Sequence, residues 1–179
     1  MYLPPAYRKL ADRLLIDLYK ANRTEAIDQV LRSVDPRILE ITPVENSIFA
    51  KLDGVGRRIP LSALGDGAVK IANLLAVVLT LPEGAVCAVD EIENGLHHTA
   101  MRAFWCALAR VATARRVQLV VTTHNLEMMR AISACIDNPS VLGSMAYLRM
   151  AWRDDGALVY DSLDSEEFVT HLDQELEIR

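Results

Sequence analysis

The stretch AVCAVDEIENGLHH, Ala85–His98, decides the fold class. Its opening AVCAV run is apolar without a polar break, which is typical of a parallel strand covered on both faces. Asp90 and Glu91 follow at the carboxyl end of this strand, where open α/β sheets place their ligand-binding crevice. Two carboxylates are costly there unless a cation or a reacting group uses them. The stretch therefore predicts either a functional acidic site or an exposed acidic turn after a core strand.

Two flanking segments favour the functional site. VQLVVTTHN, Val117–Asn125, is a second apolar strand, and its polar end contains His124. That histidine would either act on a ligand or merely cap the next helix. PLSALGDGAVKIANLLAVVLTL, Pro60–Leu81, contains a Gly-Asp-Gly turn that opens an apolar helix over 68–81. A helix N-terminus presents backbone N–H groups and a positive dipole end, which suit an anion. The glycines have the alternative role of supplying a positive φ.

Along the chain, the glycine turn comes first, the acidic strand end second and the histidine strand end third. In that order the segments resemble the motifs of ATP-binding-cassette ATPases of the RecF/OLD-like branch, often labelled AAA family ATPases. LGDGAVK is similar to the signature motif, AVCAVDE to Walker B, ENGLHH to the D-loop and TTHN to the switch-histidine motif. The resemblance covers about Arg37 to the C-terminus. The residues matched at the signature turn and in the D-loop are Gly65, Asp66, Gly67, Asn94, Gly95 and His97.

The resemblance implies a role for each motif. Asp90 would hold Mg²⁺, mostly through water, Glu91 would polarise the attacking water as the catalytic base, and His124 would contact the γ-phosphate region. The 65–67 turn would close over the γ-phosphate of an opposing copy in a head-to-tail pair. The resemblance therefore implies ATP and Mg²⁺ as ligands, bound only when the chain is assembled with its partners.

Two departures from the family pattern matter. The signature lacks the serine commonly found beside its glycines, unless Ser62 substitutes from nearby. The D-loop carries His97 where transporter-type cassettes usually have aspartate, which favours the RecF/OLD-like branch. A metal cluster of His97, His98 and the acidic residues is an alternative, but its spacing matches no structural zinc pattern. DEIE is not the D-x-D pair that a Toprim nuclease would need.

A Walker A loop needs G-x-x-x-x-G-K-[ST] between a strand and a helix. None of the eight glycines is followed by Lys-Ser or Lys-Thr, and the nearest approach, DGVGRR at 53–58, is better explained as a hairpin turn. The chain therefore resembles the C-terminal half of a cassette ATPase, beginning after the P-loop. An excised fragment, a split gene and a degenerate relative all remain open.

The length of 179 residues predicts effectively a single domain. Residues 1–36 form a helical segment, either an arm root or an ordinary helical hairpin, and 37–179 form the cassette-like lobe. The fold class is α/β and P-loop NTPase-like, with a partial parallel sheet flanked by helices and with antiparallel marginal strands. Residues 144–152 and 157–163 are expected to pair as one such hairpin.

Composition and charge limit the partners and the cellular location that we expect. A net charge of −5 argues against this piece making the main contact with nucleic acid, because phosphate neutralisation needs a basic face. No run approaches the ~20 apolar residues of a membrane span, and the N-terminus lacks a signal-peptide core. We therefore expect no membrane contact and a cytoplasmic location. Cys87, Cys106 and Cys135 are expected to be buried, reduced thiols.

Two functions of different classes follow. The first is the signature and Walker B half of an ATPase that hydrolyses ATP only when assembled with a P-loop half and a second copy. The second is a non-catalytic regulatory or scaffold module derived from such an ATPase. The 68–81 helix is apolar nearly all round, so we expect it to need cover from a missing lobe and the free chain to self-associate as a homo-oligomer.

Overall fold

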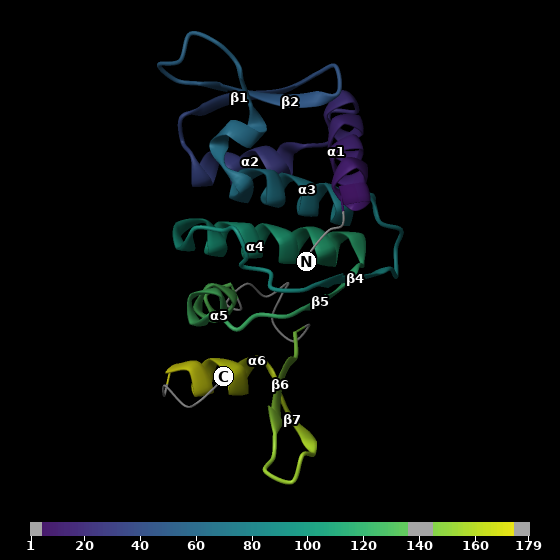
Figure 1. The fold of residues 1–179 in the computed structure, drawn as a ribbon, viewed down its shortest axis with the longest axis vertical. Helices are drawn as coiled ribbons and strands as arrows, with labels where there is room; N and C mark the ends of the chain where they lie inside the picture. Colours follow the sequence, from purple (N-terminus) through teal and green to yellow (C-terminus); the bar gives the residue numbers. More distant parts are fainter. Residues whose placement is uncertain (1–4, 136–144, 174–179) are drawn as a thin grey trace.

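The computed structural model describes the backbone of residues 5–135 and 145–173 and the side chains of 11–135 and 145–172. The elements stack in layers along the long axis, from an antiparallel sheet through helices and a parallel strand pair to a C-terminal hairpin (Figure 1). The described helices are α1 (Pro5–Lys20), α2 (Glu25–Val34), η1 (Leu61–Leu64), α3 (Asp66–Thr80), α4 (His98–Arg115), α5 (Leu126–Ser133) and α6 (Ser165–Asp173). The described strands are β1 (Ile38–Val44), β2 (Ser47–Leu52), β3 (Ile59–Pro60), β4 (Val86–Val89), β5 (Gln118–Val121), β6 (Tyr147–Trp152) and β7 (Leu158–Leu163).

The N-terminal part combines two helices with an antiparallel sheet of order β1–β2–β3. Asn22, with φ of 53°, lies between α1 and α2. Asp35 caps the end of α2 just before Pro36, and its backbone N–H donates to the carbonyl of Leu31. The 53–58 segment joins β2 to β3, which pair antiparallel, so the hairpin turn predicted there is confirmed.

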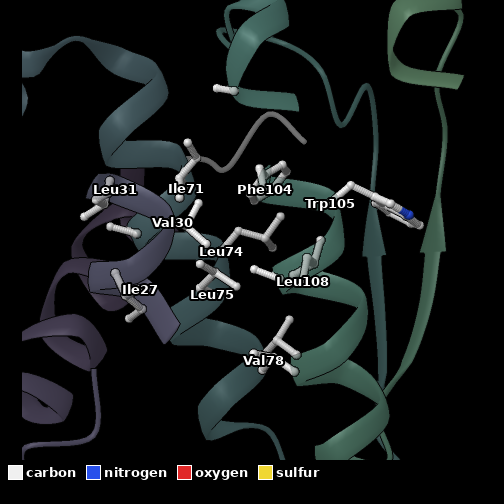
Figure 2. Packing of buried hydrophobic residues seen from close by; sticks show 14 of the residues in the cluster. Ile27, Val30, Leu31, Ile71, Leu74, Leu75, Val78, Phe104, Trp105 and Leu108 are labelled. Carbon is white, nitrogen blue, oxygen red and sulfur yellow. The ribbon is translucent and has the colours of Figure 1, made fainter. Parts of the chain in front are cut away.

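Helix α3 is the centre of the core, with α1, α2 and α4 all packed against it (Figures 1 and 2). Eight of its residues are buried, and Ile71, Leu75 and Val78 have no exposed surface. The sequence correctly predicts a helix buried on most sides. The inference that a missing lobe must supply part of its cover is wrong, because helices of this same chain supply the cover.

Strand β4, helix α4 and strand β5 form a β-α-β unit with a parallel pair. Cys87 and Val89 face the core, whereas Val86 and Val120 are 61% and 50% exposed. Ala88 and Gln118 lie on the same open face and are also exposed. The prediction that the Ala85–Val89 strand is covered on both faces is therefore wrong, because helices of this chain cover only one face. The fold class itself is confirmed: α/β, with a parallel pair and antiparallel sheets at its margins.

The cysteines differ from the prediction. Cys106 in α4 and Cys135 after α5 form a disulfide, with 5.6 Å between their Cα atoms, because the two helices pack against each other. Cys87 is the buried free thiol that the sequence predicts, and burial raises its pKa. The expectation of three reduced thiols is thus wrong for two of them.

The predicted C-terminal hairpin is confirmed as β6–β7. One of its faces packs on α6, where the rings of Tyr147 and Phe168 lie 4.9 Å apart. The register places large apolar side chains together on the other face, and each is at least half exposed. This open hairpin face consists of Leu148, Met150, Trp152, Leu158 and Tyr160. Helix α6 follows the hairpin, with Glu166 and Glu167 in its first turn.

We still predict self-association of the free chain, but through the open hairpin face. Trp152 and Tyr160 are 75% and 72% exposed, and a covered aromatic side chain buries ~150–250 Å². Light scattering at ~100 μM, a concentration at which even weak contacts are populated, should detect oligomers of the wild type. The Trp152→Ser/Tyr160→Ser double variant should be shifted to monomer, while Leu39→Ser, which removes an exposed leucine of β1, should not. A monomeric wild type would contradict this prediction.

Candidate functional site

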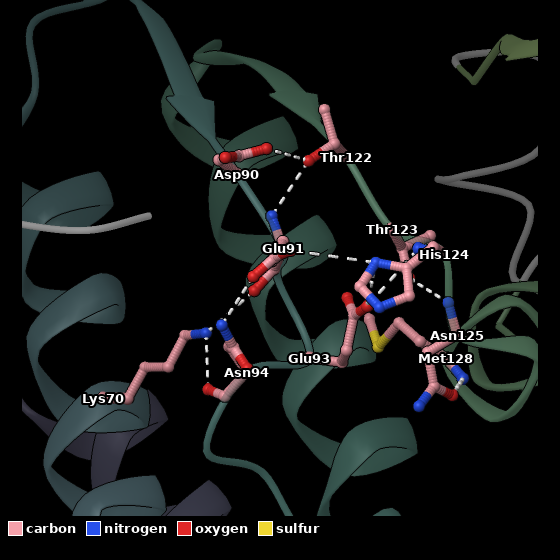
Figure 3. Close-up of polar contacts among 10 residues, drawn as sticks. All are labelled: Lys70, Asp90, Glu91, Glu93, Asn94, Thr122, Thr123, His124, Asn125 and Met128. Atoms are coloured by element: carbon pink, nitrogen blue, oxygen red, sulfur yellow. Dashed lines mark hydrogen bonds and ion pairs between the residues drawn. The ribbon is translucent and has the colours of Figure 1, made fainter. Parts of the chain in front are cut away.

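The acidic pair and the threonine after β5 meet at one edge of the parallel sheet. Parallel strands end at the same edge, so Asp90 and Glu91 after β4 lie beside Thr122 after β5 (Figure 3). The Thr122 hydroxyl donates to the Asp90 carboxylate and accepts from the Glu91 backbone N–H, at 2.9 Å. Backbone bonds from Thr122 N to Val89 O and from Ile92 N to Thr122 O continue the ladder past the strands. The acidic pair is therefore held by sheet geometry.

Glu91 has a φ of 46°, in the left-handed region that residues with a Cβ seldom adopt. Such a backbone costs about 1–3 kcal/mol and persists only where surrounding contacts fix it, most often at functional sites. Its carboxylate accepts a 2.7 Å hydrogen bond from the Asn94 side chain and is 46% exposed. The strained residue thus presents a side chain that is both held and accessible.

His124 lies against two carboxylates. Its Nδ1 is 3.6 Å from Oε1 of Glu93 and 3.9 Å from Oε1 of Glu91, and its side chain is 78% exposed. Helix α5 is capped by Asn125, whose side chain accepts from the backbone N–H of Met128 at 3.0 Å. The alternative that His124 merely caps this helix is therefore wrong.

Lys70 joins α3 to the turn that follows Glu91. Its ammonium donates to the carbonyl of Asn94 at 2.7 Å and to that of Glu91 at 3.2 Å. Burial lowers the pKa of Lys70, and the nearby carboxylates of Glu93 and Glu91 partly oppose that effect. One cation thus fixes both ends of the turn.

We predict that Lys70→Met loosens this turn without unfolding the chain. The variant loses both carbonyl contacts, so the amides of Asn94 and Leu96, which close the turn, should exchange with deuterium faster than in the wild type. Hydrogen-exchange mass spectrometry measures the change. Lys51→Met, which removes an exposed lysine of β2, is the matched control. Unchanged exchange in Lys70→Met would contradict the role given to the lysine.

The glycine turn and the D-loop segment also meet. A Cβ on Gly67 would lie 2.7 Å from the carbonyl oxygen of Gly95, so only glycine allows this approach. Gly65 has a φ of 102° and precedes α3. A cavity of about 230 Å³ adjoins the contact, and among its lining residues are Gly65, Asp66, Gly67, Gly95 and His97. A bulky residue at Gly67 would therefore disturb its own chain before it could reach an opposing copy.

Of the residues predicted from sequence, Asp90, Glu91 and His124 are brought together at the sheet edge, and the glycine turn meets the D-loop segment. His97 lines the cavity beside that contact; its ring is tilted by 37° against that of His98, with centroids 4.2 Å apart, and its Nδ1 is 3.0 Å from the Thr99 hydroxyl. Among the described side chains, those of 11–135 and 145–172, no group of three or more His, Cys, Asp or Glu is arranged to hold a metal.

Three further residues of the site, Lys70, Glu93 and Thr122, lie within the LGDGAVK, ENGLHH and TTHN motifs but received no individual role from the sequence. Thr122 could have been found, because it precedes His124 by two residues at the end of an apolar strand. Lys70 and Glu93 act through contacts between segments far apart in the chain, which local patterns do not reveal.

The chain belongs to the family described as "AAA domain, putative AbiEii toxin, Type IV TA system", which it matches over residues 2–130. An ATP/GTP phosphatase of Helicobacter pylori is 25% identical over 116 residues, which are 63% of this chain and 31% of that protein. The chain thus spans about a third of the length of this relative. An ATPase-family domain of the AAA/ABC type is the class that these matches define.

Solved structures of SMC ATPases have a similar fold. One, from a study of ATP-driven dimerization and DNA-stimulated activation of SMC ATPases, matches with a TM-score of 0.56 and 16% identity, over 94% of this chain and 99% of that one. The Smc head domain of Pyrococcus furiosus, bound to the C-terminal domain of ScpA, matches with a TM-score of 0.51 and 19% identity, over 87% of this chain and 39% of that one. At these identities the likeness establishes the fold alone. No helix in the described part of the chain is long and apolar enough to cross a membrane.

Proposed function

We propose that this chain is the signature and Walker B half of an ATPase of the RecF/OLD-like branch, active when a P-loop half and a second copy complete it. The observation that carries the proposal is the cluster at the end of β4 and β5. There, two accessible carboxylates, a threonine hydroxyl and an exposed histidine converge on one edge of a parallel sheet. This is the edge at which α/β sheets bind ligands.

The donor set fits Mg²⁺. Asp90 is exposed and hydrogen-bonded to a hydroxyl, so it offers hard oxygen ligands in the small number that Mg²⁺ usually takes from a protein. Asp90 would hold the ion mostly through water, and the ion would neutralise the phosphate charge of bound ATP. Glu91 is the candidate base, because its carboxylate is accessible while its backbone is fixed from both sides by Thr122 and Lys70.

These residues would act by positioning. The Glu91 carboxylate would accept a hydrogen bond from the attacking water and hold it for in-line displacement, which is the water-orienting role in phosphoryl transfer. His124, 3.9 Å from that carboxylate, would contact the γ-phosphate region. In the opposing copy, the Gly65–Gly67 turn would close the site, with Asn94, Gly95 and His97 of the D-loop between the two heads.

The open surfaces of the structure support a place for a P-loop half. The exposed face of β4–β5 carries Val86 and Val120, and the open hairpin face adds five large apolar side chains. Exposed apolar patches of this kind mark interaction surfaces. We place the P-loop half against these faces, with residues 1–36 and 37–179 forming one domain because α1 and α2 pack on α3.

The isolated 179-residue chain should therefore not hydrolyse ATP and should bind it weakly. It has no G-x-x-x-x-G-K-[ST] loop to cradle the phosphates, and its exposed carboxylates repel the charge of ATP. Isothermal titration calorimetry with Mg-ATP tests this. Low-micromolar affinity, worth about −8 kcal/mol, would contradict the half-site proposal, because the carboxylate edge has no donor set to supply it.

The scaffold module is the alternative supported by the same open faces, since such a module would use them to bind a partner without catalysis. The two functions differ in one outcome. A scaffold should tolerate Glu91→Gln without any change in the activity of its assembly.

A further inference from the structure

Glu93 is the one carboxylate of the site that is removed from water. Its side chain is 8% exposed, against 46% for Glu91. Burying a carboxylate is costly unless polar partners compensate, and Ile92, fully buried beside it, anchors this part of the chain. The fold thus keeps the Glu93 side chain buried, and its carboxylate requires polar partners.

The charge of the nearby Lys70 ammonium acts on this carboxylate, and its contact partner in the structure is His124. Oε1 of Glu93 accepts a hydrogen bond from the His124 backbone N–H at 3.4 Å and lies 3.6 Å from the ring Nδ1. Among the described residues, Oε2 of Glu93 is buried without a hydrogen-bond partner. One carboxylate oxygen therefore faces both the backbone and the ring of the same histidine (Figure 3).

We propose that Glu93 is a positioning residue that holds His124 in the tautomer with the proton on Nδ1. A carboxylate beside one ring nitrogen selects the N–H form of that nitrogen, and the other nitrogen remains an acceptor. Nε2 is then the atom that the exposed ring offers to a ligand. The effect on catalysis rests on the function proposed above, whereas the tautomer does not.

This arrangement gives Glu91 and Glu93 different roles. Glu91 is the more distant of the two carboxylates from Nδ1 and is held by Asn94. Because Glu93 holds the imidazole, Oε1 of Glu91, which the Asn94 hydrogen bond does not use, remains available to water. Two glutamates two positions apart thus have different partners: one orients the histidine and the other stays accessible.

The test is the tautomer of His124 in the isolated chain, measured from imidazole ¹⁵N chemical shifts at alkaline pH, where histidine is neutral. A His124→Gln variant assigns the signal among the four histidines. We expect His124 to be mainly in the Nδ1–H tautomer in the wild type. Glu93→Gln should retain this tautomer, because its amide oxygen still accepts a hydrogen bond. Glu93→Met should shift the histidine toward the Nε2–H tautomer. Glu91→Gln should leave the tautomer unchanged.

A wild-type histidine that is mainly Nε2–H would overturn the proposal, even if Glu93→Met failed to fold. So would an unchanged tautomer in a folded Glu93→Met. In the assembled ATPase, Glu93→Met should lower kcat by about 10–100-fold with little change in the KM for ATP, and Glu93→Gln should restore most of the rate. If no assembly hydrolyses ATP, the proposed function fails while the tautomer result stands.

Discussion

The Glu91→Gln variant, assembled with its P-loop half, should hydrolyse ATP about 10²–10⁴ times more slowly than the wild type, as expected for loss of a positioned base. That loss corresponds to roughly 3–5 kcal/mol of activation free energy. Glutamine keeps the size of the side chain, and its amide oxygen can still accept from Asn94, so the strained turn should survive. ATP should still bind, because Asp90 remains, and the variant should accumulate in an ATP-bound, closed state. Steady-state turnover and ATP binding are the measurements.

Two further variants serve as comparisons for Glu91→Gln. Asp90→Asn should weaken the binding of Mg-ATP itself, because the exposed ligand carboxylate is lost. Glu127→Gln, which alters an exposed glutamate of α5, should leave turnover unchanged. If Glu91→Gln hydrolyses ATP within about threefold of the wild type, less than any loss expected for a positioned base, the Walker B assignment is wrong and the scaffold alternative is favoured.

The second large effect that we predict is a loss of stability when a core side chain between the helices is truncated. Phe104 of α4 has no exposed surface and packs where α2, α3 and α4 meet (Figure 2). Truncation to alanine should lower the free energy of unfolding by about 3–5 kcal/mol, because the lost ring leaves a cavity between helices. A domain of this size has only about 5–15 kcal/mol to lose.

Urea denaturation followed by circular dichroism measures this change. Leu39→Ala, which truncates a half-exposed leucine of β1, should change stability by less than about 0.5 kcal/mol. A loss below about 1 kcal/mol for Phe104→Ala, well under the usual cost of such a cavity, would mean that the three helices do not form the packed layer that supports the site.

Much of the fold could be predicted from local patterns. The start of α3 at the Gly65–Gly67 segment and the turn residues between the strands follow from single-residue conformational preferences. The acidic pair and His124 could be placed at strand ends, and strands that run parallel bring such ends together. The roles of these residues as base, metal ligand and switch remain predictions.

The errors have one physical origin. A strand such as β4, apolar at every position, shows no alternation from which its open face could be identified. Helix α3 looks equally apolar whether its cover comes from its own chain or from another. The Cys106–Cys135 disulfide, the Lys70 contacts and the Glu93–His124 pair all depend on which helices pack together, and composition and spacing do not specify that.

The most direct test of the central claim is ATP turnover by three samples: this chain, the P-loop half expressed alone, and their equimolar mixture. We predict Mg²⁺-dependent hydrolysis only in the mixture, because the phosphate cradle and the Asp90–Glu91 edge come from different halves. Equal turnover by the P-loop half with and without this chain would contradict the claim.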